Sequence, residues 1–261
     1  MCEDRVPGGW RPGGPSLFSA VAAQRLGATV HLHGAEASGS DAFTGCFHVS
    51  PSGGRPARYE NRYDEAGART QLILDRGSPL AMPLAVGGDA VIVAPAYHEL
   101  GAVKGPLGAR LAGVCLQGVL RSALGRRVRP RARPWPSVRP LIVEGAWAFF
   151  SDEDTPGYEA LAARLVGAGM RVFVTRGPNG AILYDNAGMR AYRALPARPV
   201  DPTGAGDCFA TAFIVRLAET EDVETAARFA LAAGALAVEG HGLAGVPDRA
   251  MVEARLERVA A

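Results

Sequence analysis

Short apolar runs alternate with helical stretches along most of this chain, and this alternation constrains the fold more than any other feature. The runs lie at residues 90–95, 113–116, 141–143, 147–151 and 171–177. Each has the length of a buried strand, and residues 157–166, between the last two runs, carry a helical pattern. Strands that alternate with helices predict a mostly parallel sheet with helices on both faces.

Helical patterns also frame this region. Residues 16–27 predict a helix that Ser16 caps and Gly27 ends. Beyond residue 203 the pattern is helical, over residues 204–218, 223–238 and 247–259. The expected fold class is therefore α/β, a three-layer α/β/α sandwich around a mostly parallel central sheet.

Charge gives the chain no evident macromolecular partner. A net charge of +2 makes no electrostatic case for nucleic acid or a membrane surface. No apolar run reaches the roughly 18 residues of a membrane span. Residues 121–139 are rich in Arg and Pro, but only Trp135 could stack on a base, so they predict a solvated loop.

The chain length, the cysteine spacing and the single lysine indicate the number of domains, the compartment and one kind of nucleotide site that is absent. A chain of 261 residues suits one large α/β domain with an appendage, or two small domains. Its 4 cysteines are scattered without a Cys-x-x-Cys pair, which indicates reduced thiols and a cytoplasmic protein. The only lysine, Lys104, precedes Gly105, so a P-loop is excluded.

A glycine-rich string, Asp-Pro-Thr-Gly-Ala-Gly-Asp at residues 201–207, runs directly into an apolar helix. Small residues let a ligand approach the backbone, and the free N–H groups of a helix N-terminus bind anions. Asp207, in the first turn, is placed to take a proton from a substrate hydroxyl. The string predicts the charge stabilisation and the base that phosphoryl transfer needs. A simple capped helix is the alternative.

This string resembles the second signature of the ribokinase-like (PfkB) family of sugar and nucleoside kinases. The resemblance implies that Asp207 is the catalytic base, and that Gly204, Ala205 and Gly206 form an anion hole for the transferred phosphate. It also implies a ribokinase-like fold with a small β-sheet lid, ATP as phosphate donor and Mg²⁺ as cofactor. On this basis residues 1–261 are expected to form a single kinase domain.

The N-terminal part carries the acceptor features of the same resemblance. A Gly-Gly turn near the N-terminus binds the sugar in this family, which implies that role for Gly13 and Gly14. The family's substrate-binding Asp corresponds to Asp4. Short β-type runs predict the lid at about residues 45–75. Lid strands often pair between subunits in the family, so a homodimer is expected.

Two middle segments resemble the myo-inositol kinase branch of the family. They are Glu-Asn-Arg-Tyr at residues 60–63 and Leu-Gln-Gly-Val-Leu-Arg at residues 116–121. Asn61 and Arg62 could bind a polyol from a lid strand, and Gln117 from the carboxyl end of the sheet. A surface ion pair for Arg62 and a turn for Gln117 are the alternatives.

An acidic cluster occupies the place of the family's Asn-x-x-Glu motif, which organises magnesium and phosphates through water. With Ser151 in the Asn position, the acid is Asp154; shifted by one residue, it is Glu153. The resemblance therefore implies an acidic metal-side group at one of these two positions. An acidic helix start is the alternative.

Two further loops resemble the donor site of the family. Thr175, Arg176 and Gly177 match the strand-end loop that contacts ATP, and Arg suits phosphate. The loop at residues 237–242, with Gly240 and Gly242, resembles the one that closes over adenine. In potassium-activated members the opening Asp of the signature helps to hold K⁺. Asp201 and Thr203 match that position.

The first residues depart from the family pattern. Members open with an apolar strand that ends at the substrate-binding Asp, but only Met1, Cys2 and Glu3 precede Asp4 here. Losing three or four buried apolar side chains costs roughly 5–10 kcal/mol, against a typical total of about 5–15 kcal/mol. The expectation is an upstream start or a marginally stable chain, which in-frame coding sequence before Met1 would decide.

Together these features predict an ATP-dependent kinase that phosphorylates an alcohol of a small sugar or cyclitol. A nucleoside kinase of the same family is one alternative, although aromatic side chains for base stacking are scarce in the lid. A non-catalytic ligand-binding relative is the other.

Overall fold

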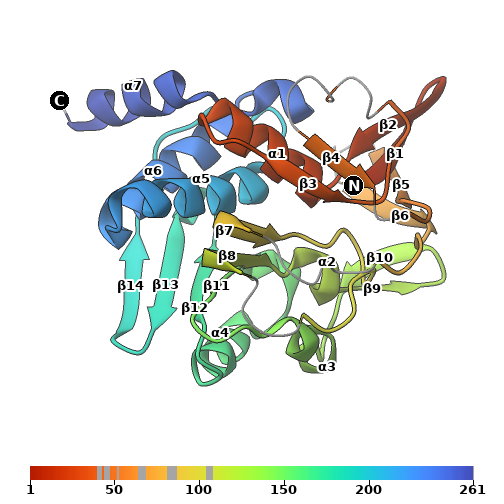
Figure 1. Cartoon of the computed structure of the whole chain (residues 1–261), viewed down its shortest axis with the longest axis horizontal. Helices are drawn as coiled ribbons and strands as arrows, with labels where there is room; N and C mark the ends of the chain where they lie inside the picture. The colour runs from red at the N-terminus through yellow and green to blue at the C-terminus, as the bar shows by residue number, and fades with distance from the viewer. Residues whose placement is uncertain are drawn as a thin grey trace.

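The computed structural model describes residues 1–39, 43, 48–51, 53–63, 69–80, 87–103 and 108–260. Cys46, Lys104 and parts of the predicted lid segment lie outside the described residues. In the described part, the strands form two six-stranded sheets and one two-stranded sheet (Figure 1).

The main sheet has the strand order β14-β13-β12-β11-β8-β7. Its strands are β7 (Gly88–Val93), β8 (Ala109–Cys115), β11 (Trp147–Ser151), β12 (Arg171–Thr175), β13 (Ala181–Asp185) and β14 (Gly188–Tyr192). The first four in chain order pair in parallel, and β13 and β14 are antiparallel. The carboxyl ends of four strands therefore meet at one edge, where α/β folds bind ligands.

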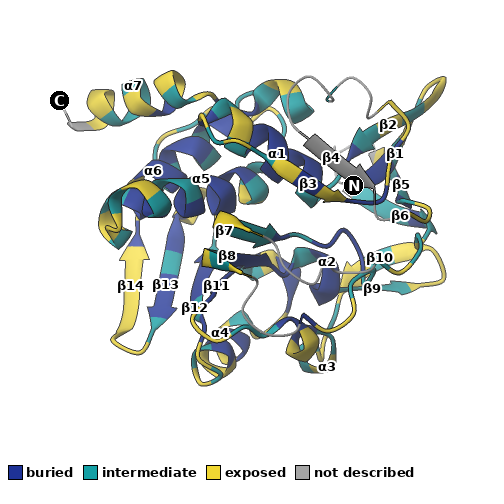
Figure 2. Cartoon of the chain, in the orientation of Figure 1, coloured by how far each residue is buried: buried dark blue, intermediate teal, exposed yellow. Residues whose placement is uncertain are grey.

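Helices cover both faces of this sheet. On one face, α5 (Ala205–Thr220) and α6 (Val223–Ala237) pack on Phe149 and Phe173, and on the other, α4 (Tyr158–Val166) packs on Phe150 and Val174. Successive side chains of a strand point to opposite faces, so apolar runs fill both layers. The expected three-layer α/β/α sandwich is confirmed, and Figure 2 shows its buried strands in dark blue beside the exposed edge strand β14.

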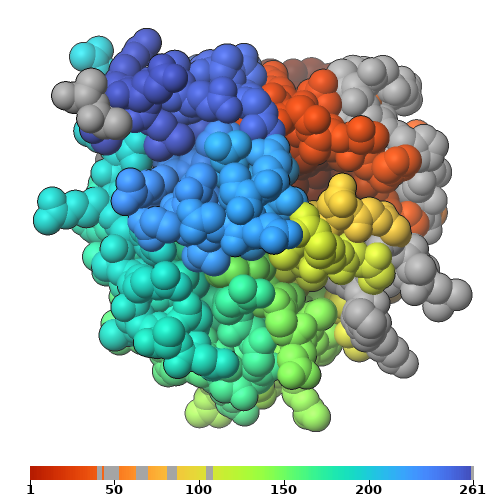
Figure 3. All heavy atoms as spheres, turned by 60° about the vertical axis from the view of Figure 1, so that its left-hand side comes forward, coloured from red at the N-terminus to blue at the C-terminus, as the bar shows by residue number. Residues whose placement is uncertain are grey.

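Two of the remaining helices, α1 (Pro15–Arg25) and α7 (Arg249–Ala260), bring the two ends of the chain together. The others, α2 (Gln117–Leu120) and α3 (Trp135–Val138), are short helices in the middle of the chain. The Arg249 side chain donates to the Leu26 carbonyl over 2.9 Å, and Arg25 donates to the Val246 carbonyl. Figure 3 shows the C-terminal helices in blue beside the N-terminal segment in orange.

A second six-stranded sheet stands beside the sandwich. Its strands are β1 (Cys2–Val6), β2 (Gly9–Gly13), β5 (Ala57–Tyr63), β6 (Arg69–Asp75), β9 (Arg121–Leu124) and β10 (Arg127–Pro130). The order β2-β1-β5-β6-β10-β9 joins three distant segments of the chain. A separate parallel pair consists of β3 (His31–Gly34) and β4 (His48–Pro51).

Three local predictions are wrong. Residues 121–139 contain β9, β10 and α3 instead of a loop, because an edge hairpin keeps its charged side chains in water. Residues 141–143 form no strand, since Leu141 belongs to a short 3₁₀ turn, Arg139–Leu141, and Ile142 ends that turn. Ser16 does not cap α1: Gly14 is the N-cap and Pro15 takes the first helical position.

Two further findings concern the redox state of the cysteines and whether any helix could cross a membrane. Cys2, Cys115 and Cys208 are free and buried thiols. Among the helices in the described ranges, none is both long and apolar enough to cross a membrane.

Candidate active site

The N-terminus of α5 lies against the first helix of the chain. Gly204 is its N-cap, in the left-handed region at φ +82°. A Cβ added to Gly204 would lie 2.1 Å from a ring carbon of Phe18, whereas one added to Gly206 would meet no described atom within 4 Å. The turn is thus packed tightly on one side and open on the other, where the first amides of a helix lack intrahelical partners.

Asp207 is the carboxylate in the first turn of α5. Burial raises the pKa of its side chain to about 7; the Arg121 guanidinium opposes this rise and the Asp154 carboxylate adds to it. A carboxyl group that changes protonation near neutral pH can accept a proton from an alcohol. The helix N-terminus beside it favours anions.

The turn after β11 distinguishes the two acidic candidates. Asp154 is buried, with 5% of its surface exposed, and its Oδ2 accepts from the Ser151 amide over 2.9 Å. Glu153 is exposed, and its amide donates to the Ser151 hydroxyl. Burial raises the pKa of Asp154, while Arg121, the Ser151 amide and the Gln117 side chain oppose the rise. Asp154, and not Glu153, therefore faces the groups around Asp207.

Four of the predicted acceptor residues, Asp4, Gly13, Gly14 and Asn61, lie together at the second sheet, whereas Gln117 begins α2. The Asn61 amide donates to Asp4 Oδ1 over 3.4 Å. A Cβ on Gly13 would lie 2.7 Å from Asp4 Oδ2, and one on Gly14 would lie 2.6 Å from the Cys2 sulfur. The Gly-Gly turn thus lets β2 and α1 approach β1 closely, and it sets Asp4 beside Asn61.

Two residues that the sequence analysis did not single out extend this group. Gln71 faces Asn61 across β5 and β6, and its Nε2 lies 3.2 Å from Asn61 Oδ1. Arg121 Nη1 donates to Gln71 Oε1 over 3.0 Å, and its Nη2 lies 3.7 Å from Asp154 Oδ1. Two features of the sequence could have indicated them: Gln71 is a polar residue on a predicted lid strand, and Arg121 is the last residue of the segment at residues 116–121.

Arg62 lies apart from this group. It pairs with Glu60 over 2.9 Å, with 64% of its side chain exposed. Neighbouring residues on a strand point to opposite faces, so Asn61 and Arg62 cannot face one ligand together. Its surroundings match the surface ion pair that was the alternative.

The first group of predicted donor residues, Thr175, Arg176 and Gly177, lies at the end of β12. Thr175 ends β12 and lies in register with Ser151, the last residue of β11. Arg176 and Gly177 follow in a turn that the Arg176 amide closes onto the Gly180 carbonyl over 2.7 Å. This turn therefore sits next to the Asp154 turn at the carboxyl edge of the main sheet.

Asp201 joins the signature string to the second donor loop. One carboxylate oxygen accepts from the Thr203 amide over 2.9 Å, and the other from the Gly242 amide over 3.0 Å. Burial would raise the pKa of Asp201, but these hydrogen bonds and nearby His241 lower it. In that loop Gly240 packs on Gly245. Asp201 thus fixes the signature string at residues 201–207 relative to the predicted donor loop at residues 237–242.

The metal-side candidates do not form a cage. In the described ranges, no three His, Cys, Asp or Glu side chains are grouped so as to hold a metal ion. Asp154 and Asp207 nevertheless lie in one another's field, with Arg121 as the opposing charge. The Asp154 carboxylate raises the pKa of Asp207, and such a pair of carboxylates suits a hydrated cation brought in with phosphates.

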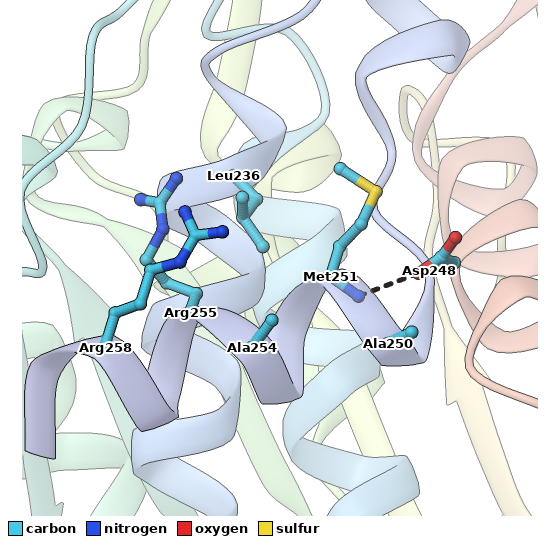
Figure 4. Close-up of a pocket in the computed structure, with 7 residues that line it drawn as sticks. All are labelled: Leu236, Asp248, Ala250, Met251, Ala254, Arg255 and Arg258. Carbon is cyan, nitrogen blue, oxygen red and sulfur yellow. Dashed lines mark hydrogen bonds between the residues drawn. The ribbon is translucent and has the colours of Figure 1, made fainter.

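Two surface hollows lie near the ends of the chain. One borders the β1–β2 turn and includes Asn61 in its wall. The other lies along α7, with the Met251 amide hydrogen-bonded to Asp248 (Figure 4). Its lining residues are Leu236, Asp248, Ala250, Met251, Ala254, Arg255 and Arg258.

Comparisons with known proteins agree with this fold. The sequence model for the pfkB family carbohydrate kinases matches residues 144–249. Solved structures with the same fold include ribokinase from Thermotoga maritima, with a TM-score of 0.67 and 18% identity over 98% of this chain and 96% of that one. A pyrophosphate-dependent kinase of the ribokinase family, complexed with a pyrophosphate analogue and myo-inositol, has a TM-score of 0.73 and 17% identity, covering 97% of this chain and 96% of that one.

Curated relatives match a shorter stretch. Ribokinase from Bacillus subtilis is 42% identical over 84 residues, 32% of this chain and 29% of the relative. A nucleoside kinase from Methanothermobacter thermautotrophicus is 36% identical over 86 residues, 33% of this chain and 27% of the relative. The matched stretch thus spans less than a third of either relative. The chain is an α/β protein with the ribokinase fold. Within that fold, residues 144–249 are similar to the pfkB family carbohydrate kinases.

Proposed function

We propose that this protein transfers a phosphoryl group from ATP to a hydroxyl of a small neutral sugar or cyclitol. The observation that carries the proposal is the position of Asp207. Its carboxyl group, with a pKa raised to about 7, stands at a helix N-terminus and in the field of Arg121 and Asp154. Phosphoryl transfer depends on positioning and charge stabilisation around such a base.

Each group of residues has a part in this reaction. Asp4, Asn61 and the Gly13–Gly14 turn bind the acceptor, with Gln117 at the sheet edge. Asp207 takes the proton of the attacking hydroxyl, and the amides of Gly204, Ala205 and Gly206 stabilise the charge on the transferring phosphate.

The donor side uses the carboxyl edge of the main sheet. Arg176, with Thr175 and Gly177, binds the donor phosphates, while Thr203, Gly240 and Gly242 line the nucleotide. Asp154 orients hydrated Mg²⁺, which would neutralise phosphate charge when bound. In a potassium-activated enzyme, Asp201 would contribute to the K⁺ site.

We also propose that residues 1–261 act as one kinase domain and that the second sheet is its lid, through which two copies could pair. The lid then comprises the β1–β2 and β9–β10 hairpins as well as the predicted segment 45–75. A nucleoside acceptor is the second candidate, favoured by the similarity to a nucleoside kinase. Two aromatic side chains of this sheet already have other contacts, which argues against their stacking on a nucleoside base. The Tyr59 hydroxyl donates to the Ala96 carbonyl, and the Arg58 guanidinium lies over the Trp10 ring.

A donor-by-acceptor assay tests the proposal. Purified protein is incubated with Mg²⁺ and either ATP or pyrophosphate, against panels of cyclitols, pentoses, hexoses and nucleosides, and phosphorylated product is measured. We expect turnover with ATP and a cyclitol or sugar. If nucleosides are the only acceptors that are phosphorylated, the proposed acceptor is wrong and a nucleoside takes its place. If pyrophosphate is the only donor that supports turnover, the proposed donor ATP is wrong. No product from wild type in any combination would favour a ligand-binding protein.

A further inference from the structure

We propose, on the basis of the function proposed above, that Arg121 is a positioning residue that couples the acceptor site on the second sheet to the acidic turn on the phosphate side. Its guanidinium bridges side chains from two different sheets. Nη1 donates to Gln71 on β6, and Nη2 faces the Asp154 carboxylate after β11.

On the acceptor side, the contacts form a continuous chain. Asp4 accepts from Asn61, Asn61 accepts from Gln71, and Gln71 accepts from Arg121. Each side-chain amide in this series donates through its NH₂ group to one neighbour and accepts through its oxygen from the other. A rotation that changes one of these hydrogen bonds therefore changes the other as well. An acceptor that takes over the Asn61 contact would therefore reorient Gln71 and, through it, Arg121.

On the phosphate side, Asp154 needs a cationic partner. Its carboxylate is buried, and its other oxygen is held by the Ser151 amide. A buried charge without a partner is strongly disfavoured. Arg121 is 20% exposed, and its carbonyl is hydrogen-bonded to the His98 ring over 2.7 Å, which fixes the start of β9. A planar guanidinium presents its donors in a fixed, spread fork that suits two partners on different sides, whereas an ammonium group is a compact point charge without that spread.

The test compares three single variants. Arg121→Gln removes the charge and Arg121→Lys keeps the charge but not the two-sided fork. Arg129→Gln changes an exposed arginine on the same hairpin and is the matched control. For each protein, the KM for the donor is measured at low and at saturating acceptor, together with kcat.

In wild type and in Arg129→Gln we expect saturating acceptor to lower the donor KM. In both Arg121 variants the donor KM should no longer depend on the acceptor. The kcat of Arg121→Gln should fall roughly 10- to 100-fold, as for a lost charge-assisted hydrogen bond, and Arg121→Lys should recover part of it. Acceptor dependence that is absent from wild type, or that survives in a folded Arg121→Lys, overturns the coupling.

An unfolding cycle separates this proposal from the proposed function. If wild type shows no phosphoryl transfer, the free energies of unfolding of Arg121→Gln, Asp154→Asn and the double variant are compared. A smaller loss from Arg121→Gln in the Asp154→Asn background supports the Arg121–Asp154 contact even though the kinase function fails. Additive losses overturn the positioning role.

Discussion

Phe18 packs directly against Gly204, so that a Cβ on Gly204 would lie 2.1 Å from the phenyl ring. This contact joins the first helix to the turn that precedes Asp207. The glycine is also left-handed, a conformation that costs about 1–3 kcal/mol for other residues. The shape of the candidate anion site thus depends on a side chain near the opposite end of the chain.

Gly204→Ala should therefore destabilise the fold by about 2 kcal/mol or more, because strain and overpacking add. Gly206→Ala is the matched control, since its Cβ would meet no described atom within 4 Å. We expect Gly206→Ala to melt close to wild type but to lose turnover, because the methyl group occupies the open side of the site. Thermal melts and kcat of both variants check this, and a Gly204→Ala protein as stable as Gly206→Ala would contradict the packing argument.

Asp207→Asn should lower kcat by about 10²–10⁴, because it preserves shape and removes the base. Its stability should depend on pH in a defined direction. The folded-state pKa of about 7 lies above the usual value of 3.8, so wild type loses stability as pH rises from about 4 to 7. The variant should lack this loss and be at least as stable as wild type at pH 8. Near-normal turnover in a folded variant would overturn the assignment of the base.

The pH dependence of turnover should report Asp207. Activity at limiting acceptor should rise with pH through about 7, since the base must be ionised. Asp154→Asn removes a negative charge that raises this pKa, so the inflection should move to lower pH. The measurement is kcat/KM from pH 5 to 9 for both proteins. An unchanged inflection in Asp154→Asn would show that the two carboxylates do not interact.

The two acidic candidates should differ in magnesium dependence. Asp154→Asn should raise the Mg²⁺ concentration needed for half-maximal rate, because the buried carboxylate faces the site. Glu153→Gln, an exposed neighbour, is the control and should titrate like wild type. Magnesium titrations at fixed donor decide between them, and the reverse pattern would assign the role to Glu153.

Acceptor affinity should depend on Asn61 more than on Arg62. Asn61→Ala removes hydrogen bonds worth about 1–3 kcal/mol when buried, so the acceptor KM should rise while the donor KM changes little. Arg62→Ala, on the opposite face, should leave both values near wild type. Steady-state kinetics with each substrate varied in turn test this. An equal rise in acceptor KM for both variants would restore the sequence-based expectation for Arg62.

Much of the fold follows from local pattern, and much of the site from one motif. The apolar runs at residues 147–151 and 171–175 became β11 and β12 because a strand buried on both faces must be apolar throughout. The Arg-rich hairpin at residues 121–130 was missed because an edge strand needs no apolar pattern.

The residues that connect the two parts of the site, Gln71 and Arg121, could not be predicted from local sequence patterns. Gln71 and Arg121 are 50 positions apart, and their contact depends on the pairing of β6 with β10. The choice between Glu153 and Asp154 likewise depended on which side chain the turn buries. Arg62 was grouped with Asn61 by adjacency, although strand alternation separates neighbours.

The contact between Phe18 and Gly204 also has a consequence during synthesis. Helix α1 leaves the ribosome early, but its buried residues Leu17 and Phe18 pack with Cys208 of α5 in one cluster. Until residues 205–220 emerge, that apolar face is covered only in part, by residues such as Met1 and Leu32, and exposed apolar surfaces make nascent chains prone to aggregate. A truncated product that ends directly before α5 should therefore be retained by chaperones or precipitate, even though it contains every described strand of both sheets.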